Sequence, residues 1–182
     1  MISWRSNAPS GRSACVFVDR DGVINERIVD GYVLDWAEFR FRPDALAALR
    51  RFAAAGLPVV VVSNQAGVGR GLLTPEALVG IMRRMQERLV ESGAPLLAWY
   101  CCPHTPADGC ECRKPGTLML RQCAQDFGFD LRSSYLVGDS PSDIAAGEAV
   151  GCTCFTVDPN AAGGFEAAAE AIVTREKAVD AI

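Results

Sequence analysis

The chain has 182 residues, of which 49% are hydrophobic, and its formal net charge is −4. A chain of this size and composition can bury one core, so we expect a single domain. The acidic balance argues against a general nucleic-acid binder, and no run of 18 apolar residues is present to predict a membrane-spanning helix.

The first 13 residues are polar and lack the apolar core of a signal peptide. We therefore expect a flexible leader over 1–13, one domain over 14–182 and a cytoplasmic location. In that compartment the eight cysteines would serve as thiols or metal ligands rather than as disulfides.

Short apolar runs that end in polar or glycine residues predict five buried strands, at 14–18, 57–62, 96–100, 134–137 and 153–157. Helical patterns lie between and after them, at 43–55, 74–91, 116–127, 141–149 and 165–174. Thr74 before Pro75 is typical of a helix start, and Gly56 and Gly93 are typical of helix ends. The alternation predicts a Rossmann-like three-layer α/β/α fold with a mostly parallel sheet of five or more strands.

Two long segments, 22–42 and 101–115, do not fit this alternation. Each follows a predicted strand, and each contains aromatic or metal-ligating side chains. Loops of this length in a compact domain are usually functional or disordered, so we interpret both as parts of a site.

The sequence Asp19-Arg20-Asp21-Gly22 follows the first predicted strand directly. Its two carboxylates therefore lie at the carboxyl edge of the sheet, where open α/β folds bind their ligands. One carboxylate can act as a nucleophile and the other as a general acid, with Mg²⁺ between them. The alternative is an ordinary turn, because Asp and Gly are common turn residues.

Three further polar clusters follow three later strands. Ser63-Asn64-Gln65 can hold phosphoryl oxygens, and Arg113-Lys114 can bind phosphate, although turn chemistry and a solvated basic pair explain each of them alone. Asp139 can ligate a hard cation with support from Asp143, although helix capping also explains this cluster, particularly at Ser140. Acids, a hydroxyl and cations at four strand ends together predict metal-assisted phosphoryl transfer through an aspartyl-phosphate.

These motifs, in this order, resemble the haloacid dehalogenase (HAD) superfamily from Val16 to about Cys154. The resemblance implies that Asp19 attacks phosphorus and that Asp21 protonates the leaving oxygen and then activates water. Ser63 and Lys114 would neutralise the transferring oxygens. Asp19, the backbone carbonyl of Asp21 and Asp139 would hold Mg²⁺.

A second strong pattern is Cys102-Pro103-His104 followed by Cys110-Glu111-Cys112. Three thiolates and one imidazole in a short loop are typical of a closed structural zinc site. Cys101 is a competing ligand, and we prefer Cys102 because of its register with His104. The alternative of buried cysteines and a core histidine fits poorly with the prolines and glycine of this loop.

Within the superfamily, a cysteine-rich loop directly before Arg-Lys-Pro resembles two families, the D-glycero-D-manno-heptose 1,7-bisphosphate phosphatases and the histidinol-phosphate phosphatases. We favour the first, in which dephosphorylation occurs at C7. This resemblance implies substrate contacts at Asp30, Tyr32, Asn64 and Gln65, with Arg113 on the second phosphate. Ser140 departs from the pattern, because heptose phosphatases usually carry Lys there.

The spacing between the motifs leaves no room for a separate cap domain. We therefore expect a monomeric phosphatase that acts on a small phosphorylated sugar, without nucleic-acid or membrane partners. The alternatives are a phosphatase for histidinol phosphate or another small phosphomonoester, and a non-catalytic zinc-stabilised module that binds metal or phosphate.

Overall fold

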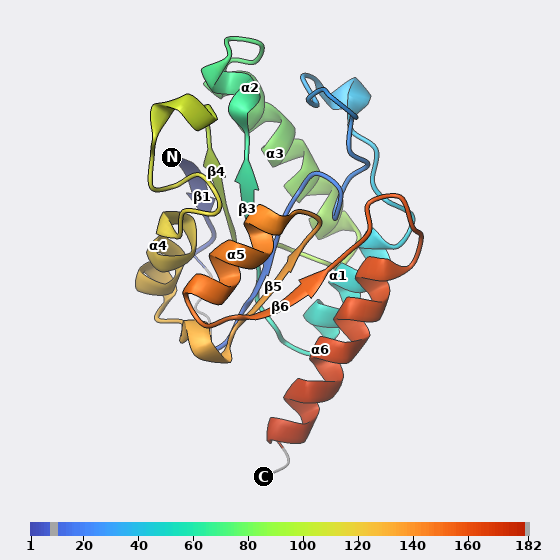
Figure 1. Cartoon of the computed structure of the whole chain (residues 1–182). Coiled ribbons are helices and arrows are strands. Elements are labelled where there is room, and N and C mark those ends of the chain that lie inside the picture. Colours follow the sequence, from blue (N-terminus) through green and yellow to red (C-terminus); the bar gives the residue numbers. More distant parts are fainter. Residues whose placement is uncertain (8–10, 181–182) are drawn as a thin grey trace.

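A six-stranded sheet forms the centre of the computed structural model, which describes residues 1–7 and 11–180 (Figure 1). The strand order is β1-β4-β3-β2-β5-β6. The strands are β1 (Ile2–Arg5), β2 (Val16–Val18), β3 (Val59–Asn64), β4 (Ala98–Cys102), β5 (Tyr135–Gly138) and β6 (Thr153–Thr156). All neighbouring pairs are parallel except β1 with β4. The predicted Rossmann-like fold and its five strands are thus confirmed.

The first strand corrects the expectation of a flexible leader. Ile2–Arg5 pairs antiparallel with β4, with Ile2 opposite Cys101, and the Ser6 amide continues the ladder to the Leu97 carbonyl at 2.9 Å. The strand is mostly exposed, and the pairing with β4 supplies hydrogen bonds to its backbone. The part of the expected leader at 8–10 lies outside the described residues.

Helices cover both faces of the sheet (Figure 1). They are α1 (Ala45–Ala54), α2 (Ala66–Gly69), α3 (Pro75–Glu91), α4 (Leu118–Phe127), α5 (Pro141–Ala149) and α6 (Gly164–Asp180). Side chains of α1, α3 and α6 share one buried cluster, and those of α4 and α5 share another. This is the three-layer arrangement that the alternation of strands and helices predicts.

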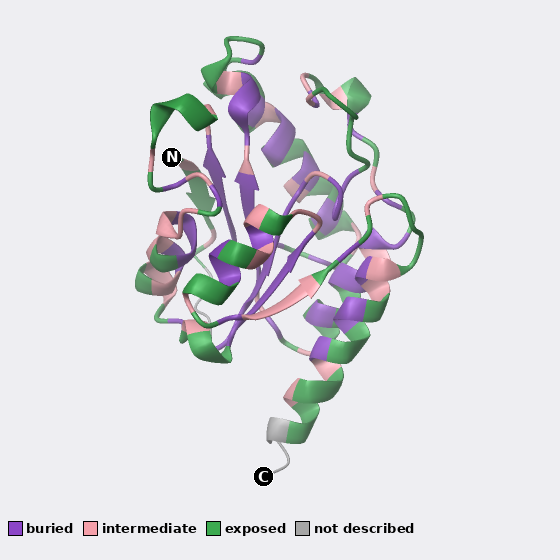
Figure 2. Ribbon diagram, viewed as in Figure 1, coloured by how far each residue is buried: buried purple, intermediate pink, exposed green. Residues whose placement is uncertain are grey.

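Alternation along each strand divides the core between the two faces. In β2, Val16 and Val18 belong to the cluster with α1, whereas Phe17 belongs to the cluster with α4. The central strands are therefore buried on both sides (Figure 2), which explains why they appear in the sequence as continuous apolar runs.

The predicted helix signals are present. The Thr74 hydroxyl accepts a hydrogen bond from the Ala77 amide at 3.1 Å at the start of α3. Gly56 and Gly93, with φ of 65° and 72°, follow α1 and α3. The short α2 was not predicted, because its four residues include two glycines and show no helical period.

Strand β4 extends into the second long segment as far as Cys102. The two segments otherwise contain short 3₁₀ turns, Trp36–Glu38 after β2 and Pro106–Asp108 after β4, and isolated bridges that join Asn25 to Asp21 and Phe41. Among the described residues no separate cap domain covers the sheet edge. None of the described helices is both long and apolar enough to span a bilayer.

Candidate functional site

Four polar clusters meet at one edge of the sheet, as the sequence predicts. Because β2 lies between β3 and β5, Asp19 at the end of β2 has Ser63 on one side and Asp139 on the other. The loop after β4 brings Lys114 to the same place. The resulting cleft of about 620 Å³ is lined by Asp19, Asp21, Lys114 and Asp139, among others.

Lys114 occupies the centre of this cluster. Its Nζ lies 2.8 Å from Asp19 Oδ1, forms an ion pair with Asp143 and donates to the Val62 carbonyl at 2.7 Å. The side chain is only 3% exposed. Burial alone would lower the pKa of Lys114, but the two carboxylates outweigh it and raise that pKa. The ammonium is therefore a fixed positive charge beside Asp19.

Asn64 holds the backbone of Lys114 in position. The Asn64 side chain accepts from the Lys114 amide at 3.0 Å and donates to the Lys114 carbonyl at 3.1 Å. This reciprocal pair ties the end of β3 to the loop that follows β4. Asn64, which the sequence assigns to substrate binding, thus also positions the lysine.

Asp19 is almost completely buried, with a side-chain exposure of 11%. Burial raises its pKa to about 7, because the attraction of Lys114 is offset by the negative charges of Asp143 and Asp21. A bound cation would favour the ionised carboxylate, which is the form that can act as a nucleophile.

Asp21 has a different environment from Asp19. Its carboxylate accepts from Arg20 and Asn25, each at 2.9 Å, and from Gln65 at 2.7 Å. Burial would raise its pKa, but these partners, Arg20 foremost, lower it instead. The ionised form accepts a proton from water, and a phosphate dianion beside it would raise its pKa toward the range of a general acid.

Arg20 and Asn25 were not predicted as parts of the site. Both are fully buried, and Arg20 is the largest such side chain in the described residues. The sequence contained a signal for Arg20, because this arginine lies between two acids at the end of a buried strand. A buried charge needs a buried partner, and Asp21 is that partner.

Gln65 and Ser63 lie beneath the cleft rather than on its surface. Gln65 is 3% exposed, and its amide donates to both Asp21 and the Ser63 hydroxyl, the latter at 2.9 Å. Gln65 was expected to contact the substrate, but in the structure its side chain orients Asp21. Ser63 is 1% exposed and does not line the cleft.

Carboxylates of Asp19, Asp139 and Asp143 form a potential cation site, with donor oxygens within 4.8 Å of one another. Hard oxygen donors of this kind suit Mg²⁺. Asp143, expected only to support Asp139, is a member of this set. The Asp21 side chain is not, and its backbone carbonyl stays a predicted ligand.

Gly22 makes the close approach of Asp139 possible. Its φ is +92°, and a Cβ at this position would lie 2.3 Å from Asp139 Oδ2. Only glycine allows both this backbone conformation and this contact. Gly22 therefore allows the carboxylate of Asp139 to lie close to the loop that follows β2.

Ser140 caps the N-terminus of helix α5, as the helix-capping interpretation proposed. Its hydroxyl and its amide bond to Asp143 Oδ2 at 2.6 Å and 3.0 Å, and its side chain accepts from the Asp143 amide in a capping box. At this position the serine stabilises the helix start and holds Asp143 toward Lys114.

The rim of the cleft contains most of the remaining predicted residues. Asp30, Tyr32, Asn64 and Arg113 all line it. Two further arginines, which the sequence did not single out, line it as well: Arg70, whose guanidinium lies 5.8 Å from the centre of the Tyr32 ring, and Arg27, which pairs with Asp139.

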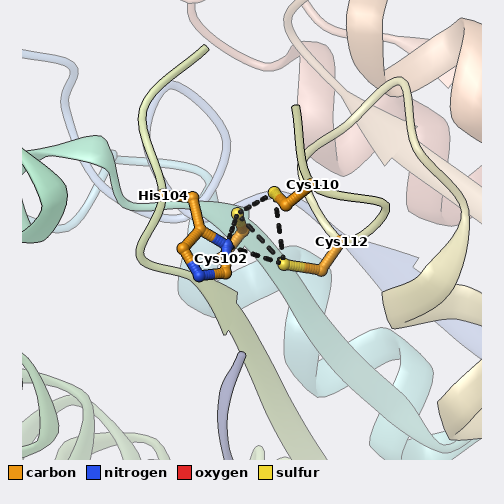
Figure 3. Close-up of side chains that lie close together, drawn as sticks. All are labelled: Cys102, His104, Cys110 and Cys112. Carbon is orange, nitrogen blue, oxygen red and sulfur yellow. Dashed lines mark hydrogen bonds between the residues drawn. The ribbon is translucent and has the colours of Figure 1, made fainter. Parts of the chain in front are cut away.

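The predicted cysteine and histidine ligands converge beside this cleft. Cys102, His104, Cys110 and Cys112 point toward one another (Figure 3). Five of the six distances between their sulfur and Nδ1 atoms are 3.3–3.6 Å. A zinc tetrahedron has edges of about 3.5–3.8 Å, so the set fits a tetrahedral metal ion.

The geometry places Cys102, rather than Cys101, beside His104, Cys110 and Cys112. Successive residues of β4 face opposite sides of the sheet, and Cys101 is buried in the cluster with α1 and α3, away from His104. None of the eight cysteines, all of which lie in the described residues, forms a disulfide.

Comparison with known proteins gives three related findings. Residues 111–178 match the HAD-hydrolase-like family model. The chain is 39% identical over 137 residues to the D-glycero-beta-D-manno-heptose-1,7-bisphosphate 7-phosphatase of Pseudomonas aeruginosa. This alignment covers 75% of this chain and 76% of the relative. It is 35% identical over 161 residues to the D-glycero-alpha-D-manno-heptose-1,7-bisphosphate 7-phosphatase of Mycobacterium tuberculosis, and this alignment covers 85% of each chain.

Among solved structures, the D,D-heptose 1,7-bisphosphate phosphatase of B. bronchiseptica, complexed with magnesium and phosphate, superposes with a TM-score of 0.81. The two chains are 32% identical, and the match covers 89% of this chain and 99% of the other.

Proposed function

The chain belongs to the D-glycero-D-manno-heptose-1,7-bisphosphate 7-phosphatase family of HAD-like hydrolases, and on this premise we propose that it removes the C7 phosphate of a heptose 1,7-bisphosphate. The reaction is the hydrolysis of a phosphoric monoester through an aspartyl-phosphate. The observation that carries the proposal is the buried pair of Asp19 and Lys114 at the floor of a cleft rimmed by arginines.

The residues divide the chemistry between them. An Asp19 carboxylate oxygen bonds to phosphorus as the bond from phosphorus to the C7 oxygen breaks, and Asp21 gives its proton to that oxygen. Asp21 then takes a proton from water, whose oxygen attacks phosphorus and releases Asp19 and inorganic phosphate. Lys114 stabilises the charge on the transferring oxygens throughout.

Two metals accompany this assignment. Asp19, Asp139 and Asp143 would hold Mg²⁺, which supplies charge neutralisation for the transferring phosphoryl group. Cys102, His104, Cys110 and Cys112 would hold a structural Zn²⁺. The zinc would fix the loop that presents Arg113 and Lys114, since the Arg113 guanidinium donates to the His104 carbonyl at 3.3 Å.

Substrate binding follows from the rim of the cleft. Arg113, Asp30 and Tyr32 line it, and a bisphosphate needs a second cationic contact at a distance from the reacting phosphorus. We assign the non-reacting phosphate to Arg113 and the sugar hydroxyls to Asp30, Tyr32 and Asn64.

The test is release of inorganic phosphate from the two anomers of heptose 1,7-bisphosphate and from histidinol phosphate, each with and without Mg²⁺. We expect the highest kcat/KM on one heptose anomer and no turnover without Mg²⁺. Asp19→Asn should abolish turnover while the protein still folds cooperatively, since Lys114 keeps Asp143 as an ion-pair partner. The control Asp130→Asn, at the opposite edge of the sheet, should retain turnover. A preference for histidinol phosphate, or normal turnover by Asp19→Asn, would refute the assignment.

A further inference from the structure

Arg27 is a charged residue of the cleft that the proposed reaction leaves without a role. Its Nη1 lies 3.3 Å from Asp139 Oδ2, and its side chain is 51% exposed. Asp139, by contrast, has a side chain that is only 4% exposed. Within the described residues, Arg27 is the one hydrogen-bond donor to this carboxylate, and Asp139 is the one partner of the Arg27 guanidinium.

Arg27 lies where it can neutralise a carboxylate that a bound cation would otherwise neutralise. Asp19, Asp139 and Asp143 bring three negative charges together, and Lys114 supplies one positive charge, placed between Asp19 and Asp143. Asp139 lies at the side that Lys114 does not contact. Arg27 therefore neutralises the same carboxylate that the proposed Mg²⁺ site requires.

The Asp139 carboxylate is tightly confined, whereas the Arg27 side chain is half exposed. Gly22 lies directly against Asp139 Oδ2, so the carboxylate has little room to shift. The loop carrying Arg27 is anchored before it, where the Glu26 amide donates to the Arg40 carbonyl at 2.8 Å. Beyond Arg27 the loop is open, and Val29 is 73% exposed. A long side chain on such a loop can leave one partner for another at small cost.

We propose that Arg27 is a movable counter-ion, which pairs with Asp139 before the metal binds and turns to the phosphate of the substrate once Mg²⁺ has taken its place. The proposal rests on the magnesium-dependent function given above. Arg27 lines the same cleft as Lys114 and Arg113, so a released guanidinium faces the space that a phosphate dianion would occupy. Guanidinium groups bind phosphate oxygens through paired hydrogen bonds.

The proposal has two consequences of opposite sign for one substitution. Removal of the charge in Arg27→Gln removes a competitor for Asp139, so Mg²⁺ should bind the substrate-free protein more tightly. The same substitution removes a phosphate contact, so binding of phosphate to the magnesium-loaded protein should weaken. A residue with a purely structural role would weaken both interactions.

Isothermal titration of the full chain, first with MgCl₂ alone and then with inorganic phosphate at saturating Mg²⁺, separates these effects. We expect Arg27→Gln to bind Mg²⁺ about two- to tenfold more tightly and phosphate about two- to tenfold more weakly than wild type. Arg27→Lys should lie between the two. The control Arg83→Gln, which removes an exposed arginine paired with Glu87 on α3, should change neither.

Unchanged or weaker Mg²⁺ binding in Arg27→Gln would overturn the counter-ion role, and unchanged phosphate binding would overturn the transfer to substrate. Either result leaves the phosphatase assignment intact, because wild-type turnover is measured separately. A wild-type protein that binds no Mg²⁺ would overturn both proposals.

Discussion

Replacing Lys114 by Met tests the central charge of the site. The substitution keeps an unbranched stem of nearly the same length and removes the ammonium that Asp19 and Asp143 share. It leaves two buried carboxylates and the Val62 carbonyl without their common donor. We therefore expect a large loss of stability in addition to the loss of activity.

The magnitude follows from the burial of the partners. Removing one member of a buried ion pair costs about 3–5 kcal/mol, because the remaining charge has lost its compensation. In a domain of this size such a loss lowers the melting temperature by roughly 10 °C. An exposed lysine contributes far less, so Lys177→Met, which alters the only other lysine of the chain, is the matched control.

The loss should depend on pH in a definite direction. Burial already raises the pKa of Asp19 to about 7 in the folded protein, against an ordinary value of 3.8, and removal of Lys114 would raise it further. Between these values the folded state holds a proton that the unfolded state releases, so stability falls as pH rises. The destabilisation by Lys114→Met should therefore be greatest at pH 8 and about 1.4 kcal/mol smaller at pH 5.

Urea unfolding of wild type, Lys114→Met and Lys177→Met in magnesium-free buffer at pH 5 and pH 8 measures both effects. Equal destabilisation at the two pH values would show that Lys114 contributes packing rather than charge compensation. A destabilisation below about 1 kcal/mol, the range of an exposed pair, would refute the assigned burial.

Three further predictions concern the other parts of the site. Cys110→Ser should lose most of its zinc, measured by metal analysis after gel filtration, since one ligand of a closed tetrahedron is replaced by a weaker one; a wild-type zinc content would contradict the ligand set. Gly22→Ala should weaken Mg²⁺ binding at least tenfold by calorimetry, because its Cβ would displace the Asp139 carboxylate, and unchanged affinity would contradict that contact. Ser140→Ala should lower the unfolding free energy by about 1 kcal/mol in urea titration through loss of the α5 cap, whereas Ser142→Ala should cost less.

The sequence predicts the parts of the fold that a continuous apolar run or a helical period encodes. The central strands are buried on both faces and appear as continuous apolar runs, so their ends could be predicted from the sequence. Their ends in turn indicate that Asp19, Lys114 and Asp139 meet at one edge of the sheet. Strand β1 could not be predicted, because only Ile2 of its four residues is even partly buried and the strand exists through its pairing with β4. Tertiary hydrogen bonding, rather than local preference, determines that segment.

The same distinction applies within the site. Residues that act through charge at a strand end could be identified from the motifs. The role of Gln65 could not be assigned from the motif, because it depends on which way the side chain turns after the strand ends. Its side chain turns inward to Asp21, whereas the motif alone also allowed a contact with substrate.

The antiparallel pairing of β1 with β4 also makes tryptophan fluorescence sensitive to whether this edge strand is attached to the sheet. Of its three tryptophans, Trp4 and Trp99 lie opposite each other in the register of these strands, and Trp99 is 3% exposed. Three residues beyond Trp99 the same strand supplies the ligand Cys102. In a Trp36→Phe background, a red shift of the remaining fluorescence would therefore detect detachment of this edge strand next to the cysteine cluster.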